Sequence, residues 1–529
     1  MEFVFYRDIV MHAMEIQPAA SSFFLVLVIL MYYCVGKIYK QKSKVVEKLP
    51  PGPWKLPIIG NLHQLAWESS LPHRALRDLA NKYGPLMHFQ LGEISALVVS
   101  SPHMAKQILK THDIAFLQRP QTLASQILFY GSTNIALAPY TDYWRQMRKI
   151  CILELLSAKR VQSFAFTREN EVAKLIHFIH FSQGSPLNLT KAVSSLTNTI
   201  ISRVAFGQKS KHEDEVLFLI KKIPQLLGGF DLADLFPSLK PLHLITGLKT
   251  KLENVHKKLD KVLDNIVHEH QLRMRSSNHE ARNEREKEDL VDVLLRVQQN
   301  GTLQIPLTLK NIKAVILDIF AAGTDTSAIV IEWAVSELMK NPRVREKVQA
   351  EIREAFKGKK TFYESDLDEL RYLKSVIKET MRLHPPAPLL LPRECREPCK
   401  IGEYEIPIKT RVMVNVWALG RDSNHWYDAN SFIPERFDDT NIDFKGNNFE
   451  FIPFGSGRRI CPGISLALAT VQLILAALLY HFDWELPNGM KPEDLDMTEV
   501  FGAGLVKKNN LCLIPTWYDA PLQDNVTAN

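Results

Sequence analysis

The chain has 529 residues, of which 46% are hydrophobic and 23% charged, values typical of a globular protein. Its net charge of +7 is modest for that length and gives no indication of a nucleic-acid partner. The length alone would allow several domains. Because the sequence contains no Gly/Ser linker and no internal repeat, we predict one large domain instead.

An uncharged apolar run near the amino terminus predicts a membrane anchor. Residues 16–36 carry no charged side chain, and as a helix rising about 1.5 Å per residue they would span the roughly 30 Å hydrocarbon core of a bilayer. Lysines follow from Lys37 to Lys48, and positive charge favours the cytosolic side. A cleaved signal peptide is the alternative, but lysines stand where its small-residue cleavage site would be. We predict an anchor over residues 1–36, with the transmembrane helix at about 16–36.

A basic, proline-rich linker over residues 37–61 is predicted to join the anchor to a catalytic domain, residues 62–529. Four prolines hold the linker in a stiff, extended form: Pro50, Pro51, Pro53 and Pro57. The six cysteines are too scattered to suggest a disulfide framework, which agrees with a cytosolic domain.

Beyond residue 60 the hydrophobic pattern predicts a mainly α fold with a minor β part. Apolar residues recur at helical spacing in seven segments: 75–83, 104–111, 141–156, 169–181, 189–206, 215–227 and 252–274. Short β-rich runs predict a small sheet: 86–91, 97–100, 404–406 and 411–416. The charged stretch 275–289 is predicted to be a surface connection.

One predicted helix is long and buried. It begins after the capping residue Thr308 and reaches Lys340, where Asn341-Pro342 stops it, and its centre is apolar nearly all round. The cluster "AAGTDTS", residues 321–327, lies inside that apolar centre. Threonine hydroxyls can bond to a carbonyl one turn earlier and open the helix locally. We expect either a groove that presents an acid and a hydroxyl to a buried cavity, or a satisfied polar notch.

The segment "KETMR" places Glu379 and Arg382 three residues apart on one helical face, where they can pair. Such pairs usually lie at the surface and contribute little. Arg436 in "FIPERF" is available as a third member. A network of the three would be a folding clamp and would take no part in chemistry.

The most distinctive segment is "PFGSGRRICPG", residues 453–463. A thiolate that binds iron needs hydrogen-bond donors around its sulfur and backbone that can approach closely. Glycines at 455, 457 and 463 remove Cβ atoms around Cys461 and allow both. Arg459 could supply a cation to a heme propionate.

These motifs together resemble those of a plant microsomal cytochrome P450, a heme-thiolate monooxygenase, and in particular the plant group of terpenoid and alkaloid hydroxylases. The resemblance extends from Pro50 almost to the end of the chain and rests on four motifs in the expected order: "WRQMRK", "AGTDTS", "KETMR" with "PERF", and "FGSGRRICPG". It implies the cytochrome P450 fold, in which heme b is held between a long central helix and a Cys-containing loop.

The resemblance also implies roles for individual residues. Cys461 would be the axial ligand of the heme iron, and Asp325 and Thr326 would supply protons during oxygen activation. Glu379, Arg382 and Arg436 would form the structural clamp. The remaining cofactor-binding residues would be Trp144, Arg148, Arg393 and Arg459 at the propionates, with Phe454, Gly457 and Gly463 in the loop.

The activity implied is NADPH- and O2-dependent hydroxylation of a hydrophobic plant specialised metabolite. Residues 230–239 resemble the terpenoid hydroxylases of this plant group, so a terpenoid is our first choice and an alkaloid or phenylpropanoid the alternative. A heme-thiolate isomerase or dehydratase, which typically lacks the acid–hydroxyl pair, and a non-enzymatic heme-binding membrane protein are further alternatives. The resemblance places the substrate pocket at Ala321, Ala322, Leu389, Leu390 and Ala503.

Because the sequence has no nucleotide-binding motif, electrons from NADPH would come through a separate NADPH-cytochrome P450 reductase, with cytochrome b5 as a second candidate donor. Four basic residues near the thiolate would either form part of the reductase docking face or serve only as solvated surface and propionate partners: Arg145, Arg148, Lys149 and Arg458. The protein would be a single-pass protein of the endoplasmic reticulum membrane, in contact with lipid, with its catalytic domain on the cytosolic face.

Overall fold

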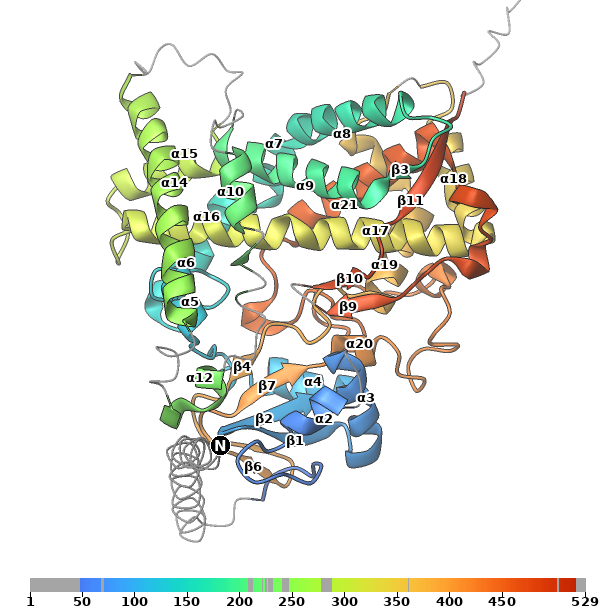
Figure 1. Cartoon of the computed structure of the whole chain (residues 1–529). Helices are drawn as coiled ribbons and strands as arrows, with labels where there is room; N and C mark the ends of the chain where they lie inside the picture. The colour runs from blue at the N-terminus through green and yellow to red at the C-terminus, as the bar shows by residue number, and fades with distance from the viewer. Residues whose placement is uncertain are drawn as a thin grey trace, which may run out of the picture.

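The computed structural model describes residues 48–67, 71–207, 213–220, 222–223, 226, 232–239, 247–276, 288–359, 361–501 and 504–519. The predicted anchor, the linker before residue 48, most of the charged connection 275–289 and the pocket residue Ala503 lie outside these ranges. The predicted fold class, mainly α with a minor β part, is confirmed (Figure 1).

Helices are the main secondary-structure elements of the described chain, and a helix lies in each of the seven segments predicted from apolar spacing. The helices before the central one are α2 (Leu62–Trp67), α3 (Pro72–Tyr83), α4 (Pro102–Lys106), α5 (Leu123–Leu128), α6 (Asp142–Ile150), α7 (Ala158–Ser163), α8 (Ala165–His180), α9 (Leu189–Phe206), α10 (Glu213–Ile220), α12 (Leu232–Leu235), α14 (Leu248–Ser276) and α15 (Leu290–Gln299). Those after it are α18 (Pro342–Ala355), α19 (Arg371–Leu383), α20 (Val416–Leu419) and α21 (Ile464–His481). Two predicted helices end in π-helical turns, η1 (Gln107–Thr111) after α4 and η2 (Cys151–Leu155) after α6.

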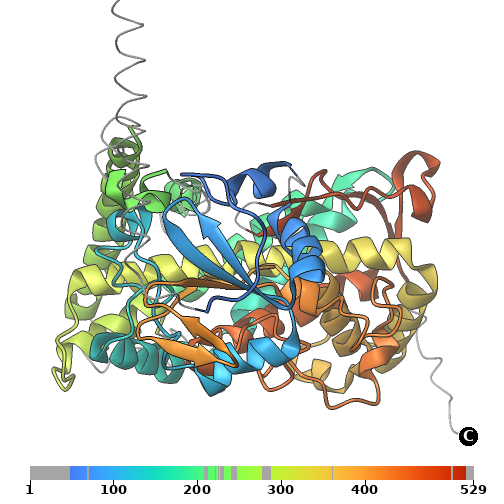
Figure 2. The ribbon, with the colours of Figure 1, turned by 90° about the horizontal axis from the view of Figure 1, so that it is seen from below.

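The main sheet has four strands in the order β1-β2-β7-β4. β1 (Leu86–Leu91) and β2 (Ile94–Val99) form a hairpin, β7 (Arg411–Val414) runs parallel to β2, and β4 (Arg393–Glu394) closes the edge. Seen from below, the hairpin lies across the central helices (Figure 2). The smaller sheets contain β3 (Leu187–Asn188), β5 (Cys399–Ile401), β6 (Tyr404–Ile406), β8 (Phe482–Glu485), β9 (Glu499–Phe501), β10 (Leu505–Lys507) and β11 (Cys512–Trp517).

The predicted central helix is present but is divided in two. α16 (Leu309–Gly323) and α17 (Asp325–Lys340) follow one another across the molecule, with Thr324 between them (Figure 1). Thr308 caps α16 through a reciprocal capping box with Asn311. At the junction the Thr324 hydroxyl donates to the Phe320 carbonyl at 3.0 Å, while the Thr324 backbone N–H reaches the same carbonyl at 3.3 Å. The next backbone bond, from Ala328 to the Thr324 carbonyl, is 3.5 Å long. The hydroxyl therefore competes for the carbonyl and loosens the ladder at this turn.

Two described runs are long and apolar enough to cross a membrane, namely Leu309–Lys340 and Ile464–His481. In each, 61% of the most apolar window is buried inside the protein. Both runs contribute to the largest hydrophobic core cluster, for example through Phe320 and Leu475. Core packing therefore explains their hydrophobicity without a membrane.

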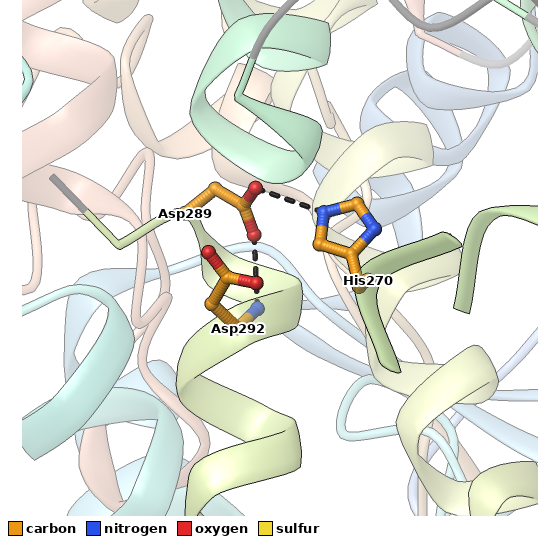
Figure 3. A group of neighbouring side chains, drawn as sticks. All are labelled: His270, Asp289 and Asp292. Atoms are coloured by element: carbon orange, nitrogen blue, oxygen red, sulfur yellow. Dashed lines mark hydrogen bonds and ion pairs between the residues drawn. The ribbon is translucent and has the colours of Figure 1, made fainter. Parts of the chain in front are cut away.

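A buried ion pair joins α14 to the start of α15 (Figure 3). The His270 ring places Nδ1 2.8 Å from the Ile266 carbonyl and Nε2 2.8 Å from Asp289 Oδ2. Asp289 also caps α15, because its Oδ1 accepts the Asp292 backbone N–H at 2.9 Å. Both ring nitrogens of His270 face acceptors, which favours the protonated ring. Although His270, Asp289 and Asp292 are close enough to hold a metal ion, Arg273 lies 3.9 Å from Asp289, and its charge opposes a cation there.

We predict that His270→Gln destabilises the protein in a pH-dependent way. Burial lowers the pKa of His270, but the hydrogen bond and charge of Asp289 outweigh it and leave the pKa raised. A raised folded-state pKa stabilises the fold below the ordinary histidine value of about 6.5 and loses that effect as pH rises through the folded-state pKa. Urea unfolding should show a loss of about 2 kcal/mol at pH 6 and a smaller loss at pH 8.5. The exposed His268→Gln on the same helix is the control, and equal losses for His270→Gln at both pH values would contradict the protonated pair.

Candidate functional site

The loop that contains Cys461 is shaped by glycines in the left-handed region. Gly455 has φ 74° and Gly457 has φ 71°, and a Cβ at position 457 would lie 2.2 Å from the Leu109 carbonyl oxygen. A short 3-10 turn, η6 (Gly457–Arg459), follows, and the Cys461 N–H donates to the Phe454 carbonyl at 3.0 Å. The predicted residues Phe454, Gly457 and Cys461 therefore build one tight loop in which glycine is required at 457.

The Cys461 thiol lies just before helix α21, whose capping residue is Gly463. The side chain is half-buried, and burial raises the pKa of the thiol, while the Gly463 backbone N–H and the Arg148 charge act in the opposite direction. A metal ion bound to the sulfur would deprotonate it outright. The helix amino terminus, the N–H donor and the nearby guanidinium all favour a thiolate at this position.

Four buried or half-buried guanidinium groups surround this loop: Arg119, Arg148, Arg393 and Arg459. Burial lowers the pKa of all of them, to about 9 for Arg459. Repulsion from neighbouring guanidinium groups adds to that effect for Arg119, Arg148 and Arg459, whereas Asp113 opposes it for Arg393. Among the described residues, Asp113 is the carboxylate that pairs with this cluster, at 2.7 Å from Arg393. The exposed Arg458 shares the same carboxylate at 3.1 Å. The site thus holds more positive than negative charge.

Backbone carbonyls hold these arginines in place. Arg459 donates to Leu117 at 3.0 Å and to Ala138 at 2.7 Å, and its guanidinium lies 4.3 Å over the Trp144 ring. The other contacts in the cluster are Arg119 to the Ala136, Leu391 and Pro392 carbonyls, Arg148 to the Ile460 carbonyl, and Arg393 to the Ser456 carbonyl. Trp144 in turn donates from Nε1 to the Ile135 carbonyl at 2.9 Å.

These residues fit heme b, the cofactor that the sequence resemblance implies. Heme carries propionate carboxylates at one edge, and the excess of buried guanidinium groups requires anions, because unpaired buried charge is costly. A half-buried thiol in a glycine-shaped loop next to a helix amino terminus suits an axial thiolate. The donor set and the charge balance are thus those of a heme-thiolate site.

Arg119 and Asp113 were missed by the sequence reasoning. The signal for Arg119 was an arginine directly after the apolar run Ala115–Leu117 and Gln118, in the segment "AFLQRP", where a buried charged side chain needs a partner. Asp113 had no comparable signal, since "THDIA" reads as an ordinary surface turn.

The turn of the central helix that holds the predicted catalytic pair borders open space. Ala322 is exposed, and Ala321, Asp325 and Thr326 are half-buried, although α16 and α17 are mostly buried on either side. The Thr326 hydroxyl donates to the Ala322 carbonyl at 2.6 Å, as the sequence predicted for hydroxyls in this motif. The exposure of Ala322 shows that protein does not cover this face of the helix, which leaves room there for another group.

Of the predicted pocket residues, Leu389 and Leu390 are half-buried in the loop after α19. Leu390 has φ 51°, and its Cδ1 would lie 3.7 Å from a Cβ at Gly455. This contact places the loop after α19 against the loop that contains Cys461. Ala503 lies outside the described residues, but Gly504 next to it packs near Ile329 of α17 and the Pro386 carbonyl.

The predicted clamp residues are in direct contact. Glu379 of α19 accepts two bonds from Arg382, at 2.7 and 2.8 Å, and one from Arg436 at 3.0 Å. It also accepts the backbone N–H of Ile433 at 2.8 Å. Arg382 continues to the Ala429 carbonyl at 2.7 Å. Glu379 and Arg382 are almost fully buried, so this is not the surface ion pair that the spacing alone would suggest. The network fixes the segment that leads into the Cys461 loop.

Comparison with known proteins gives one family. The family model "Cytochrome P450" matches residues 50–514. Cytochrome P450 71D8 of Glycine max is 59% identical over 507 residues, covering 96% of this chain and 100% of the relative. Premnaspirodiene oxygenase of Hyoscyamus muticus is 55% identical over 482 residues, covering 91% and 95%. A solved zebra fish cytochrome P450 superposes with a TM-score of 0.71 at 25% identity, covering 85% of this chain and 100% of the other.

We predict that Glu379→Gln is strongly destabilising, because it leaves two buried guanidinium groups without their carboxylate. Breaking a buried ion pair from one side typically costs about 3–5 kcal/mol. Urea unfolding and the yield of folded protein measure the effect. Glu354→Gln, which removes an exposed ion pair with Lys357, should change neither quantity measurably. A Glu379→Gln protein as stable as Glu354→Gln would show that the clamp does not stabilise the fold.

Proposed function

This chain belongs to the cytochrome P450 family, and from that premise we propose that it hydroxylates a hydrophobic plant terpenoid at a heme held between Cys461 and the central helix. The observation that carries the proposal is the pairing of a thiol in a glycine-shaped loop with a cluster of buried arginines that needs anions. An alkaloid or phenylpropanoid substrate is the alternative.

Family membership fixes the reaction class. The protein is a monooxygenase with a heme iron cofactor, and its electrons come from NADPH through a redox partner, the reductase that this family generally uses. When bound, the heme activates dioxygen so that one oxygen atom enters the substrate and the other leaves as water. The chain itself must bind the heme, orient the substrate and control water and protons.

On the thiolate side we assign Cys461 as the axial ligand. Arg148, Arg393 and Arg459, together with Arg119, would neutralise the propionates. Trp144 would act mainly by positioning, since its ring supports Arg459 at 4.3 Å and Arg148 at 5.4 Å. Burial of these guanidinium groups makes each charge interaction stronger than it would be in water.

On the oxygen side we assign Asp325 and Thr326 to proton delivery. Thr326 keeps its hydroxyl oxygen next to the Ala322 carbonyl at 2.6 Å, at the edge of the uncovered face that the exposed Ala322 marks. Asp325 is half-buried one residue earlier on the same turn. A hydroxyl and a carboxyl on adjacent residues can pass protons from the protein to the site of oxygen reduction. This pair favours a monooxygenase over a heme-thiolate isomerase or dehydratase.

The proposed substrate side is mostly apolar. Ala321, Ala322, Leu389 and Leu390 offer no side-chain hydrogen bond, so shape and hydrophobic contact would orient the guest. One relative, premnaspirodiene oxygenase, is named for a reaction on premnaspirodiene, which is a terpenoid. That relationship, together with the apolar lining, supports a terpenoid as the substrate class.

We further propose that residues 16–36 anchor the protein to the endoplasmic reticulum membrane, with residues 37–61 as the linker and the catalytic domain, residues 62–529, on the cytosolic face. Trp54, at the start of the described chain, leaves 59% of its surface exposed, and tryptophan favours the membrane interface. The exposed Arg145 and Lys149 of α6 and the exposed Arg458 side chain would form part of the reductase docking face. Cytochrome b5 is a second candidate partner.

We predict that the reduced, carbon monoxide-bound protein shows a band at about 450 nm, as thiolate-ligated heme does. Cys461→Ser should lose that band, whereas Cys399→Ser, which lies on a strand of a separate small sheet, should keep it. Reconstitution with reductase, NADPH and a terpenoid panel then tests for hydroxylated product. A retained 450 nm band in Cys461→Ser would remove the ligand assignment, and product from alkaloids alone would replace the substrate class.

We predict that Thr326→Ala lowers product formed per NADPH at least several-fold and raises hydrogen peroxide release, because the reduced oxygen loses its proton donor. Measurement of NADPH, product and peroxide in the same reaction checks this. Ser327→Ala is the matched control, since Ser327 carries a neighbouring hydroxyl on the buried face of the same helix. Unchanged coupling in Thr326→Ala would take Thr326 out of the mechanism.

A further inference from the structure

Asp318 is a carboxylate on the central helix that none of the assignments above uses. It lies on α16, one turn before Ala322, and is half-buried. Its Oδ1 accepts the Asn134 side-chain amide at 2.6 Å, and its Oδ2 accepts the backbone N–H groups of Ile135 and Ala136 at 2.5 and 3.0 Å. A carboxylate on α16 of the central helix thus holds a loop about 180 residues earlier in the chain through three hydrogen bonds.

The same loop presents its carbonyls to the arginine cluster. The Ile135 carbonyl accepts Trp144 Nε1 at 2.9 Å and an Arg459 guanidinium N–H at 3.4 Å. The Ala136 carbonyl accepts Arg119 Nε at 3.0 Å. Ile135 and Ala136, whose N–H groups bind Asp318, therefore also supply carbonyls that hold Trp144, Arg459 and Arg119.

Because a peptide bond is planar, the orientation of the Ala136 N–H determines the orientation of the Ile135 carbonyl. The Ile135 carbonyl and the Ala136 N–H belong to one trans peptide unit, so they point in opposite directions and rotate together. Asp318 fixes the N–H end, and the carbonyl end must then face Trp144 and Arg459. Negative charge at the N–H end also polarises the peptide and makes its carbonyl a better acceptor.

We propose that Asp318 is a positioning residue for the heme: through the Ile135–Ala136 peptide it orients Trp144 and Arg459 toward the propionates. Arg119 binds the carbonyl of the next peptide in the same loop. The proposal rests on the proposed function, because it assumes that these arginines bind heme. Burial raises the pKa of Asp318 to about 6, so the carboxylate is charged near neutral pH. Its charge also offsets part of the surplus positive charge of the cluster.

A merely structural role is the competing explanation, since any buried hydrogen-bonded carboxylate stabilises its surroundings. The chain offers a matched control on the same pair of helices. Glu332 of α17 is 7% exposed, is hydrogen-bonded by the Thr190 hydroxyl, and has a pKa raised by burial. Its carboxylate interacts with Thr190, Lys507 and the Leu511 backbone, none of which belongs to the arginine cluster.

The experiment compares Asp318→Asn with Glu332→Gln, both isosteric losses of charge, in the full-length heme-loaded protein. The rate of heme transfer to excess apomyoglobin is measured at pH 7.5, and urea unfolding is measured alongside it. In Asp318→Asn the side-chain oxygen can still accept the two backbone N–H groups. The Asn134 Oδ1 has no hydrogen-bond partner among the described residues, so the Asn134 amide can rotate and accept the new side-chain N–H. Asp318→Ala removes both the charge and the hydrogen bonds.

We expect heme release to be about threefold faster in Asp318→Asn and about tenfold faster in Asp318→Ala, a tenfold change being about 1.4 kcal/mol. Glu332→Gln should release heme at the wild-type rate even where it lowers stability to urea. Equal release rates for Asp318→Asn, Glu332→Gln and wild type would overturn the proposal. If Asp318→Ala yields no heme-loaded protein, the comparison of heme release between Asp318→Asn and Glu332→Gln is sufficient to test the proposal.

This test is separate from that of the proposed function. The release rates require only that the chain binds heme, whereas the proposed function falls if the wild type lacks the thiolate band or forms no hydroxylated product. A wild type that hydroxylates its substrate while Asp318→Asn keeps its heme as firmly as Glu332→Gln would reject the positioning role and leave the proposed function standing.

Discussion

Buried positive charge is the constraint on which the arrangement of this molecule depends. Guanidinium groups that leave water need partners, because the desolvation of each charge costs several kcal/mol. In the described chain, carbonyls from residues 117–138 and 391–392 and the carbonyls of Ser456 and Ile460 supply most of those partners. Carbonyl dipoles reduce the cost without balancing the charge. Three segments far apart in the sequence must therefore meet around a group that brings negative charge of its own.

The central helix meets two opposing requirements: it must be apolar to cross the core, and it must carry polar groups for the proposed chemistry. A helix that crosses a core must be apolar, as α16 and α17 are over most of their length. Oxygen chemistry needs protons, which apolar side chains cannot supply. The residues from Ala321 to Thr326 confine the polar groups to one turn, where Thr324 and Thr326 satisfy their hydroxyls on carbonyls of the preceding turn. The helix is loosened at that turn and intact on both sides.

The sequence predicts those features that a short segment determines by itself. The Cys461 loop follows from its glycines, and the cap at Thr308 and the stop at Asn341 follow from local helix chemistry. Features that depend on distant partners could not be predicted. The spacing of Glu379 and Arg382 indicates a pair but not its complete burial, which arises because Ala429 and Ser431 carbonyls arrive from another segment. The role of Arg119 and the partners of Asp318 likewise depend on contacts across more than a hundred residues, for which a single sequence holds no signal.

The two sides of the site are governed by different interactions, and this has a consequence for specificity. The thiolate side is held by charge and by directional hydrogen bonds, so a change of one atom there leaves a buried charge without its partner. The proposed substrate side offers mainly alanine and leucine side chains, where exchanging one apolar residue for another of similar volume typically costs less than about 1.5 kcal/mol. Substitutions on the substrate side can therefore reshape the pocket while the arginine cluster and the Cys461 loop keep their geometry. The Asp318 bridge crosses between the two sides, and for that reason a residue on the oxygen-side helix is expected to be as intolerant of change as those beside the thiolate.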